Sequence, residues 1–579
     1  MSKNDKLDLF KILSTEAESY RSIDQIETLV DEKYDLAPLP VQPLYLAIKS
    51  LPVERVAEYL PRLSPDQRTA FLDIDLWQKD ELDVEQFQFW VQAYWLCEDD
   101  NVRLDFVKSD QFGLFLKGKF NVWTFDVEEP EYPDHDNYFL TEDSLLLVEY
   151  EENYPFVQEL KEMIRLLYAD LGVENAYAYL FKIVSDGFLT LQEDEYYQKK
   201  ERMREIGFVD YFDALDIDSS FVHFEQLHGF ILRKAKEKTF AAEVNDHAKN
   251  QTLHLSSLIP FRDHFNSVVE ELNKVKDQKR VDFLQFNFVR LLNAEIELNT
   301  ALKRGSLAMN RTGASVKNIL TLAINYMNSS YIRSQFLTIG ELSIFDKMDF
   351  VDVFRVGNSL LKIPKKDLKK ALAKTGFEEE RETFLGKNWE EFLDLTFDEE
   401  TKFISVNNKA QKAQAILTFE DYEEWRYKVK ALHDLLPFAQ KFYETFSTLK
   451  NDGKIHDSYY LNYTVDSIDF EALLLSSFAN HFLGSFQEEN TSKIGLTIDE
   501  FKSFATKIIS SEGKFILTPE LYQKIQFFME SFGLKDVSGF NNYLQKILQE
   551  QLEGYEYEQL DFEDFKHVGG PIILNRHRH

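Results

Sequence analysis

Apolar residues recur at steps of three and four along most of the chain, which is the period of an amphipathic helix. Three such segments between Leu44 and Trp77 span only two or three turns each, and the breaks between them carry Pro52, Pro61 and Pro65. Proline opens a helix readily but is costly deep inside one. The stretch "LPVERVAEYLPRLSPDQRTAFLDI" (51–74) therefore predicts short helices that stack to bury their apolar faces. Ser64 is the expected N-cap of the helix that starts at Pro65.

Longer helices are predicted from residue 156 onward. "VQELKEMIRLLYADLG" has helical spacing with Gly172 as its stop, and "VDFLQFNFVRLLNAEIELNTALKRG" is a long helix that ends at Gly305. Before them, "NYFLTEDSLLLVEY" (137–150) has β-rich ends around a polar turn and predicts a small hairpin. The other predicted helical segments are a lead-in at 5–34 and residues 315–328, 346–363, 409–433, 436–450, 468–484, 498–510, 518–532 and 538–553.

The fold class that follows is mainly α, with a short-helix superhelical repeat at the N-terminus, helical-bundle units after it and a small β hairpin. A chain of 579 residues is too long for a single core, because cores stop growing at roughly 250 to 300 residues. We expect four domains: a short-helix repeat at 1–100, a helical unit with an acidic loop and the hairpin at 101–217, a central helical domain at 218–380 and a C-terminal helical domain at 381–579.

Composition and charge limit the classes of partner. A formal net charge of −34 repels phosphate backbones, so nucleic-acid binding is disfavoured. No run approaches the ~20 apolar residues of a membrane span, and the start of the chain lacks the apolar stretch of a signal peptide. The single cysteine, Cys97, suits a reducing compartment and is expected to be a buried, inert thiol. We expect a cytoplasmic protein without stable membrane insertion.

Enzyme and metal motifs are missing from the sequence. The only Glu-x-x-His, Glu225 to His228, has no second copy with which to build a di-iron site, and His247, His254 and His264 lack metal-ligand spacing. Residues 120–160 carry twelve acids and no Lys or Arg, which suits either a Ca²⁺ site or an unliganded acidic loop. The missing EF-hand spacing favours the loop. We expect no metal, no cofactor and no identifiable catalytic residue.

Two basic segments stand out against the acidic background. "LKRGSLAMNRTGAS" (302–315) has the glycines, hydroxyls and cations of an anion-binding loop before a helix, but it lacks the phosphate-loop pattern, which favours a plain connection between helices. "LLKIPKKDLKKALAKTGF" predicts a basic amphipathic helix around residues 362–374, opened by Pro364. Such a helix suits an anionic membrane or an acidic partner, or it is simply a solvated face. Its narrow apolar face favours the solvated alternative.

Four segments together resemble a bacterial family, the domain of unknown function 6178 family. They are "LPVERVAEYLPRLSPDQRTAFLDIDLW", "LTLQEDEYYQKKERMREIGFVDYFDALDI", "LAMNRTGASVKNILTLAINYMN" and "VDVFRVGNSLLKI". The resemblance covers most of the chain and supports a helical architecture, but it implies no activity. Residues 44–75 also resemble, in pattern only, the intracellular N domain of MgtE magnesium transporters, without a magnesium site.

The arginines within these segments are Arg202, Arg204, Arg311 and Arg355. An arginine between apolar neighbours either extends its guanidinium to solvent or is held by a carboxylate, because an unpaired buried charge is too costly. We expect Arg355 to be partly buried and paired with an acid from a neighbouring helix. Solvent exposure and the recognition of a bound anion are the alternatives.

The preferred function is a non-catalytic scaffold or adaptor that binds other proteins. The alternative is an enzyme or a small-molecule-binding protein with a site between helical units. Exposed apolar faces favour the first. A buried cluster of charged residues around a pocket favours the second. The sequence does not indicate the oligomeric state.

Overall fold

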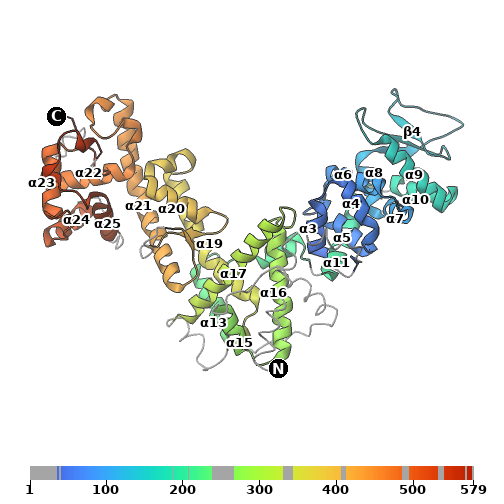
Figure 1. Cartoon of the computed structure of the whole chain (residues 1–579), viewed down its shortest axis with the longest axis horizontal. Coiled ribbons are helices and arrows are strands. Elements are labelled where there is room, and N and C mark those ends of the chain that lie inside the picture. The colour runs from blue at the N-terminus through green and yellow to red at the C-terminus, as the bar shows by residue number, and fades with distance from the viewer. Residues whose placement is uncertain are drawn as a thin grey trace. The chain divides into compact units, whose positions relative to one another are not determined.

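The computed structural model describes residues 36–37, 41–185, 187–206, 208–237, 267–329, 343–405, 412–485, 494–531, 540–567 and 570–576. The chain divides into two compact units, one from Met1–Ser220 with His228–Asn358 and the other from Phe221–Leu227 with Ser359–His579. Helices dominate both units (Figure 1), so the fold is mainly α as predicted. The four-domain division stays a prediction. The lead-in helix predicted at 5–34 and the histidines at 247, 254 and 264 lie outside the described residues.

The first unit begins with short helices at the predicted places. Ser64 caps the helix that starts at Pro65: its hydroxyl accepts from the Gln67 amide (3.2 Å), and the Gln67 side chain accepts from the Ser64 amide (2.9 Å). Because these bonds join residues that are close in sequence, the sequence alone predicts where such a helix begins. The elements here are α3 (Val41–Lys49), α4 (Val53–Tyr59), the 3-10 turn η1 (Leu60–Arg62), α5 (Pro65–Asp75), α6 (Val84–Leu96), α7 (Asp100–Val107) and α8 (Asp110–Lys119), with the strand pair β1 (Trp77–Gln78) and β2 (Glu81–Leu82) between α5 and α6.

These short helices stack around one aromatic core. Phe71, Phe87 and Phe112 are fully buried, and Trp90 is 1% exposed. Tyr94 stacks on Phe106 with ring centres 4.1 Å apart. Aromatic pairs of this kind add to the burial of apolar area, which stabilises helices that are too short to be stable alone. Cys97 belongs to the same core and is buried, as predicted, and burial raises the pKa of its thiol.

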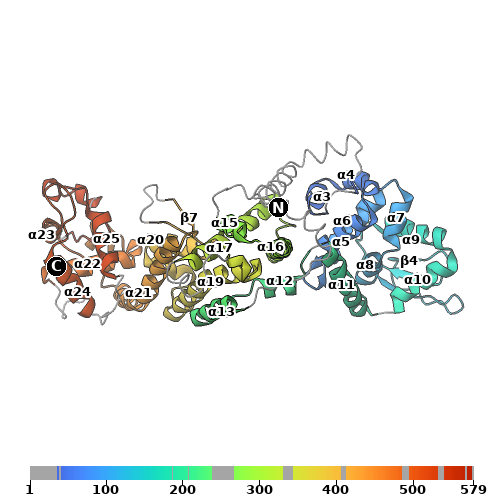
Figure 2. The same cartoon turned by 90° about the horizontal axis from the view of Figure 1, so that it is seen from below.

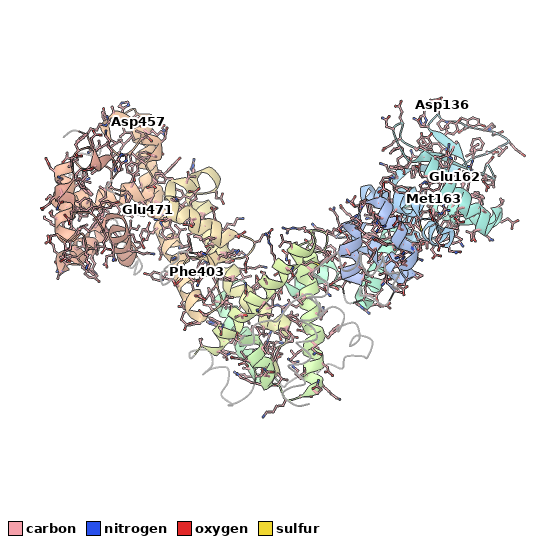
Figure 3. The ribbon with its side chains drawn as sticks, viewed as in Figure 1. Asp136, Glu162, Met163, Phe403, Asp457 and Glu471 are labelled. Atoms are coloured by element: carbon pink, nitrogen blue, oxygen red, sulfur yellow. The ribbon has the colours of Figure 1, made fainter. Side chains whose placement is uncertain are left out.

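The predicted hairpin is present and has a third strand. Strands β4 (Tyr138–Leu140) and β5 (Leu146–Glu149) pair antiparallel, and β3 (Asn121–Thr124) pairs with the other edge of β5, which gives the order β3-β5-β4. In both views this sheet lies beside α9 (Val157–Leu171) and α10 (Val173–Ser185) (Figure 2). Met163 on α9 is 1% exposed and faces the core, whereas its neighbour Glu162 is half-buried (Figure 3). The acidic residues 126–136 connect β3 to β4 as an open stretch, with Asp136 exposed.

The rest of the first unit is built from longer helices. Gly172 ends α9 with a positive φ of 74°, as expected of a glycine stop. Gly357 allows a close approach of two helices, because a Cβ built there would lie 2.3 Å from the Ile319 carbonyl oxygen. The remaining elements are α11 (Phe188–Glu205), α12 (Tyr211–Ile217), α13 (Phe224–Lys236), α15 (Ser267–Lys274), α16 (Gln278–Leu298), α17 (Ser306–Asn328), η3 (Ile344–Asp346) and α19 (Phe350–Thr375), of which α13 and α19 run into both units.

The second unit has its own aromatic core, in which Trp425 and Tyr422 are fully buried. Phe403, labelled in Figure 3, is fully buried in the same unit. Its last four helices begin and end within two residues of the predicted bounds. The elements are η4 (Glu379–Leu385), α20 (Lys387–Phe397), the strand pair β6 (Lys402–Phe403) and β7 (Gln414–Ala415), α21 (Phe419–Asn451), η5 (Asp457–Tyr459), η6 (Val465–Ser467), α22 (Phe470–Leu483), α23 (Ile498–Ile508), α24 (Pro519–Ser531), α25 (Phe540–Leu552), η7 (Tyr557–Gln559) and η8 (Asp564–Lys566).

Two predicted helix breaks are wrong. Pro364 was expected to open a helix and instead lies inside α19, and Pro437 lies inside α21, where two separate helices were predicted. An internal proline costs about 3 kcal/mol through a lost hydrogen bond and a clash. Burial of flanking side chains such as Leu360, Leu368 and Leu436 offsets that cost. Tertiary packing therefore continues both helices through residues that locally favour a break.

The basic stretch at 362–374 is the second half of α19. Its apolar residues Leu368 and Leu372 are buried, and Lys365 donates to the Thr401 hydroxyl (3.1 Å). Lys366, Lys369 and Lys370 are exposed. The apolar face is thus already packed, as expected of a solvated basic face. Within the described ranges, no helix combines the length and apolar character that a membrane crossing requires.

Candidate functional site

A cavity of about 400 Å³ lies in the first unit, where three stretches that are distant in sequence meet. The end of α5 with β1 forms one wall, α11 with the start of α12 the second, and the end of α16 with the following loop the third. More than half of the lining residues lie in two of the family-like segments, 51–77 and 189–217. The lining residues are Asp73, Ile74, Trp77, Gln78, Lys79, Lys199, Lys200, Met203, Phe208, Val209, Asp210, Tyr211, Asn293, Ile296, Glu297, Leu298, Thr300, Leu302 and Lys303.

A buried ionic network lies beside the cavity. Arg202 of α11 donates to both carboxylate oxygens of Asp73 on α5 (2.8 and 2.9 Å) and also pairs with Glu195. The side chains of Asp73 and Glu195 are 0% and 2% exposed. Gln111 donates to Glu195 (2.9 Å). This two-pronged pair fixes α11 against α5, and with it the two walls of the cavity that these helices form.

Burial sets the protonation of this network. Desolvation raises the pKa of Glu195 to about 7, against the opposing attraction of Arg202. Within the described part of the chain, Oε2 of Glu195 is buried without a hydrogen-bond partner, as a protonated carboxyl tolerates better than a charged one. Burial acts against the charge of Arg202, but hydrogen bonds and charge attraction to Asp73 and Glu195 together outweigh it and raise the pKa of the guanidinium.

A second buried carboxylate, Asp75, anchors the end of α5. It accepts hydrogen bonds from the Tyr45 hydroxyl and the Trp90 indole, both at 2.8 Å, and pairs with Lys49. Lys303, in the loop after α16, donates to the main-chain carbonyls of Asp75 (3.2 Å) and Trp77 (2.8 Å). Burial lowers the pKa of this lysine. The loop is thereby fastened to the C-terminal end of α5, where a cation is favourable.

Two further ionic groups face the cavity, Lys199 from α11 and Glu297 from α16. The Lys199 ammonium lies 5.4 Å from the ring centres of both Trp77 and Tyr196. Burial lowers the pKa of Lys199 and raises the pKa of Glu297, and each group opposes the shift of the other. Among the described residues, neither side chain has an ion pair or a hydrogen bond.

Backbone strain gathers at the same place. In the described ranges, three residues other than glycine have a positive φ: Lys79 (61°), Thr300 (47°) and Ser144 (59°). Lys79 and Thr300 both line the cavity. Such conformations cost of order 1–3 kcal/mol and persist only where the surroundings enforce them, which is common at functional sites.

The structure distributes the residues that the sequence singled out. Arg202 is held by carboxylates beside the cavity, whereas Arg204 lies on the surface, with its side chain 73% exposed and paired with Glu201 (3.3 Å). Arg355 is half-buried and donates to the Asp216 main-chain carbonyl at the end of α12 (3.0 Å). It therefore contacts a neighbouring helix through a main-chain carbonyl, and this bond caps the C-terminal end of that helix, whereas the predicted pairing with a carboxylate stays a prediction. His228 contacts the Tyr326 hydroxyl (2.8 Å).

Sequence reasoning missed most of the cavity. The segment 302–315 was weighed as a helix connection or an anion site, and it does connect α16 to α17 while its Lys303 reaches the cavity. Lys199 and Glu297 gave no signal, because a lysine or glutamate on a polar helix normally faces water. Adjacent lysines in "QKKERMREIGF" on a helix that also carries Arg202 were the only local clue.

The second unit contains a separate buried carboxyl cluster. Glu471 at the start of α22 (Figure 3) is 5% exposed and accepts from the Tyr543 hydroxyl (3.0 Å) and the Asn388 amide (3.1 Å). Trp389 in turn donates to the Tyr543 oxygen (2.6 Å). Burial, and then the neighbouring Asp469, raise the pKa of Glu471 to about 7. Asn388, Trp389 and Tyr543 also line a cavity of about 480 Å³.

In the described ranges, no group of three or more His, Cys, Asp or Glu side chains is placed to hold a metal ion. The acidic stretch 126–136 is exposed, and the Asp126 carboxylate accepts from the main-chain amide of Glu128 (2.8 Å). His135 pairs with Glu149 (2.6 Å) at the same end of the sheet.

Fold and sites together define a mainly helical protein with a polar cavity in one unit and a buried carboxyl cluster in the other. The model of a family of unknown function (DUF6178) matches residues 14–572. Because that match spans nearly the whole chain, the protein belongs to this family, as its four characteristic segments indicated. No curated protein and no solved structure matches the chain. The likeness of residues 44–75 to the MgtE N domain stays a prediction.

Proposed function

We propose that this protein binds a small polar molecule in the cavity of its first unit. The observation that supports this most strongly is the convergence of ionic side chains from α5, α11 and α16 on one cavity. A buried charged cluster around a pocket is the feature that favours ligand binding over a purely structural role. The cavity volume lies within the range of small-molecule sites.

The energetics of the lining favour this function over a structural one. Burying ionic groups is costly, and apolar residues of similar volume often stabilise a fold as well or better. Asp73 and Arg202 satisfy each other, but Lys199 and Glu297 are desolvated without a direct partner among the described residues. The positive φ of Lys79 adds a further cost in free energy at the same cavity. A bound molecule that pairs with the lining groups offsets these costs.

A cavity-blocking variant tests the proposal. Leu298 lines the cavity at the last position of α16, so Leu298→Trp should fill the space, whereas Leu307→Trp places the same ring on an exposed position of α17. The measurement is a thermal-shift screen of the full chain with carboxylates, amino acids, sugar phosphates and nucleotides. We expect at least one compound to raise the Tm of the wild type and of Leu307→Trp but not of Leu298→Trp. A screen in which no shift depends on Leu298 contradicts the proposal.

An adaptor that binds other proteins in the cytoplasm is the second candidate. It is supported by large apolar side chains on the surface, including Leu189 (77% exposed) and Tyr197 (64%) on α11. Single exposed apolar residues are normal on monomeric proteins, so this observation weighs less than the cavity. Affinity capture of the native protein separates the two candidates, because an adaptor brings down stoichiometric protein partners whether or not its cavity is blocked by Leu298→Trp.

A further inference from the structure

Apart from Lys79, which is exposed and lies 5.1 Å from the ring centre of Tyr211, the ionic groups of the cavity fall into two sets. The first set is already paired within the protein: Asp73 with Arg202 (2.8 Å), and Asp210 with Lys200 (3.4 Å). Lys303 likewise donates hydrogen bonds to main-chain carbonyls at the end of α5. The second set is Lys199 and Glu297, which approach the cavity from different helices and form neither an ion pair nor a hydrogen bond within the described part of the chain.

Lys199 and Glu297 attract each other electrostatically, but they form no ion pair within the described part of the chain. The Lys199 ammonium rests against the rings of Trp77 and Tyr196, each centre 5.4 Å away, so the aromatic wall positions it. Glu297 belongs to the last turn of α16, on a different wall of the cavity. A ligand that lies between them must present an anion to the lysine and a cation to the glutamate.

The remaining lining determines the rest of the ligand. Ile74, Met203 and Ile296 are more than nine-tenths buried and contribute an apolar surface next to the two charges. The lysine and the glutamate sum to zero charge, so a ligand without net charge leaves this pair balanced. A carboxylate and an ammonium on one small molecule with an apolar side chain meet each of these requirements.

We infer that the cavity is a site for a free α-amino acid with an apolar side chain, whose carboxylate pairs with Lys199 and whose ammonium pairs with Glu297. The inference rests on the proposed ligand-binding function and specifies its ligand class. Both contacts are charge-assisted hydrogen bonds, the strong kind, and each involves a half-buried protein group. Loss of either partner therefore lowers affinity at least tenfold.

Calorimetry with L-leucine and two matched analogues tests the ligand class. Isocaproate is leucine without its amino group, and isoamylamine is leucine without its carboxylate. We expect the full chain to bind leucine or another apolar amino acid in the same series, and to bind both analogues at least tenfold more weakly. Isocaproate binding as tightly as leucine identifies a simple anion site and overturns the zwitterion inference while leaving ligand binding in the cavity intact.

Substitutions at the two charges test the assignment of residues. Lys199→Met and Glu297→Gln should each weaken amino-acid binding at least tenfold. Lys182→Met and Glu174→Gln on the exposed face of α10 are the matched controls and should bind as the wild type does. An unchanged thermal midpoint for each variant shows that it is folded. Equal affinity of Glu297→Gln and the wild type for the amino acid overturns the inference. The inference also fails if no amino acid binds although the thermal-shift screen finds other ligands whose effect is lost in Leu298→Trp.

Discussion

Replacement of Arg202 by methionine tests the network that fixes the walls of the cavity. Methionine keeps the apolar stem of the side chain, but it removes the donors to Asp73 and Glu195. Asp73 has no exposed side-chain surface, so its charge stays buried without its main partner. Breaking a buried ion pair in this way costs about 3–5 kcal/mol.

Protonation of the stranded aspartate sets an upper limit to that cost. For a carboxyl whose pKa in the unfolded chain is about 3.9, taking up a proton at pH 7 costs about 4 kcal/mol, and at pH 5 only about 1.5 kcal/mol. A variant carboxyl with a raised folded-state pKa contributes stability at low pH and loses it as pH rises. We therefore expect Arg202→Met to destabilise the first unit by about 3–4 kcal/mol at pH 7 and by less than about 2 kcal/mol at pH 5.

Urea unfolding followed by tryptophan fluorescence measures the loss, because four of the six tryptophans lie in the first unit. Arg204→Met is the matched control: Arg204 lies on the same helix, is 73% exposed and pairs only at the surface. Its expected loss is below about 0.5 kcal/mol. Equal losses of the free energy of unfolding in both variants at pH 7 contradict a stabilising role for the buried pair of Asp73 and Arg202. A loss in Arg202→Met that is equal at pH 5 and pH 7 assigns the effect to packing.

Four further predictions concern other parts of the chain. Leu60→Ala should lower the free energy of unfolding by about 2–5 kcal/mol, because the side chain is fully buried, and a loss below about 0.5 kcal/mol in urea contradicts the stacking of the short helices. Gly357→Ala should cost at least about 1–3 kcal/mol through the clash between helices, whereas Gly229→Ala, with open space around its Cβ position, should be neutral or stabilising; equal thermal midpoints refute the close approach. Glu471 has a pKa raised from its usual 4.5 to about 7, so its contribution to stability is present below pH 4.5 and lost as pH rises through 7. Glu471→Gln should remove about 3 kcal/mol of this pH dependence. Urea unfolding of the second unit at pH 5 and pH 8 measures it, and a variant with the same pH dependence as the wild type contradicts the raised pKa. Calcium should give no saturable binding at residues 126–136, and a micromolar site in calorimetry overturns that expectation.

Local signals in the sequence were sufficient for much of the fold. Ser64 and Pro65 mark the start of α5 because the capping bonds form within three residues, and Gly172 ends α9 because its backbone conformation suits glycine. The sequence predicts a helix break at Pro364, but α19 continues through this residue. The packing that stabilises the continuous helix comes from residues distant in sequence. Strand β3 was missed because four residues on a sheet edge have too weak a period to stand out.

Most residues of the candidate site could not be predicted from the sequence. Asp73 and Arg202 are 129 residues apart, and no spacing rule links an acid on one short helix to an arginine on another. The segments that contain them were recognised as family-like, yet their joint position at one cavity becomes visible only when the helices are packed. The sequence did not single out Lys199 and Glu297, because periodicity alone does not reveal which polar face of a helix is covered.

The long separation between Asp73 and its arginine has a consequence for synthesis on the ribosome. At typical translation rates of 5–20 residues per second, the 129 residues between them take roughly 6 to 26 s to make. During that time α5 can form, but Asp73 lacks the cation that its burial requires. The helices before α11 should therefore dock late, and nascent chains that stop short of Arg202 should be preferred clients of chaperones and proteases compared with chains that extend past Lys303.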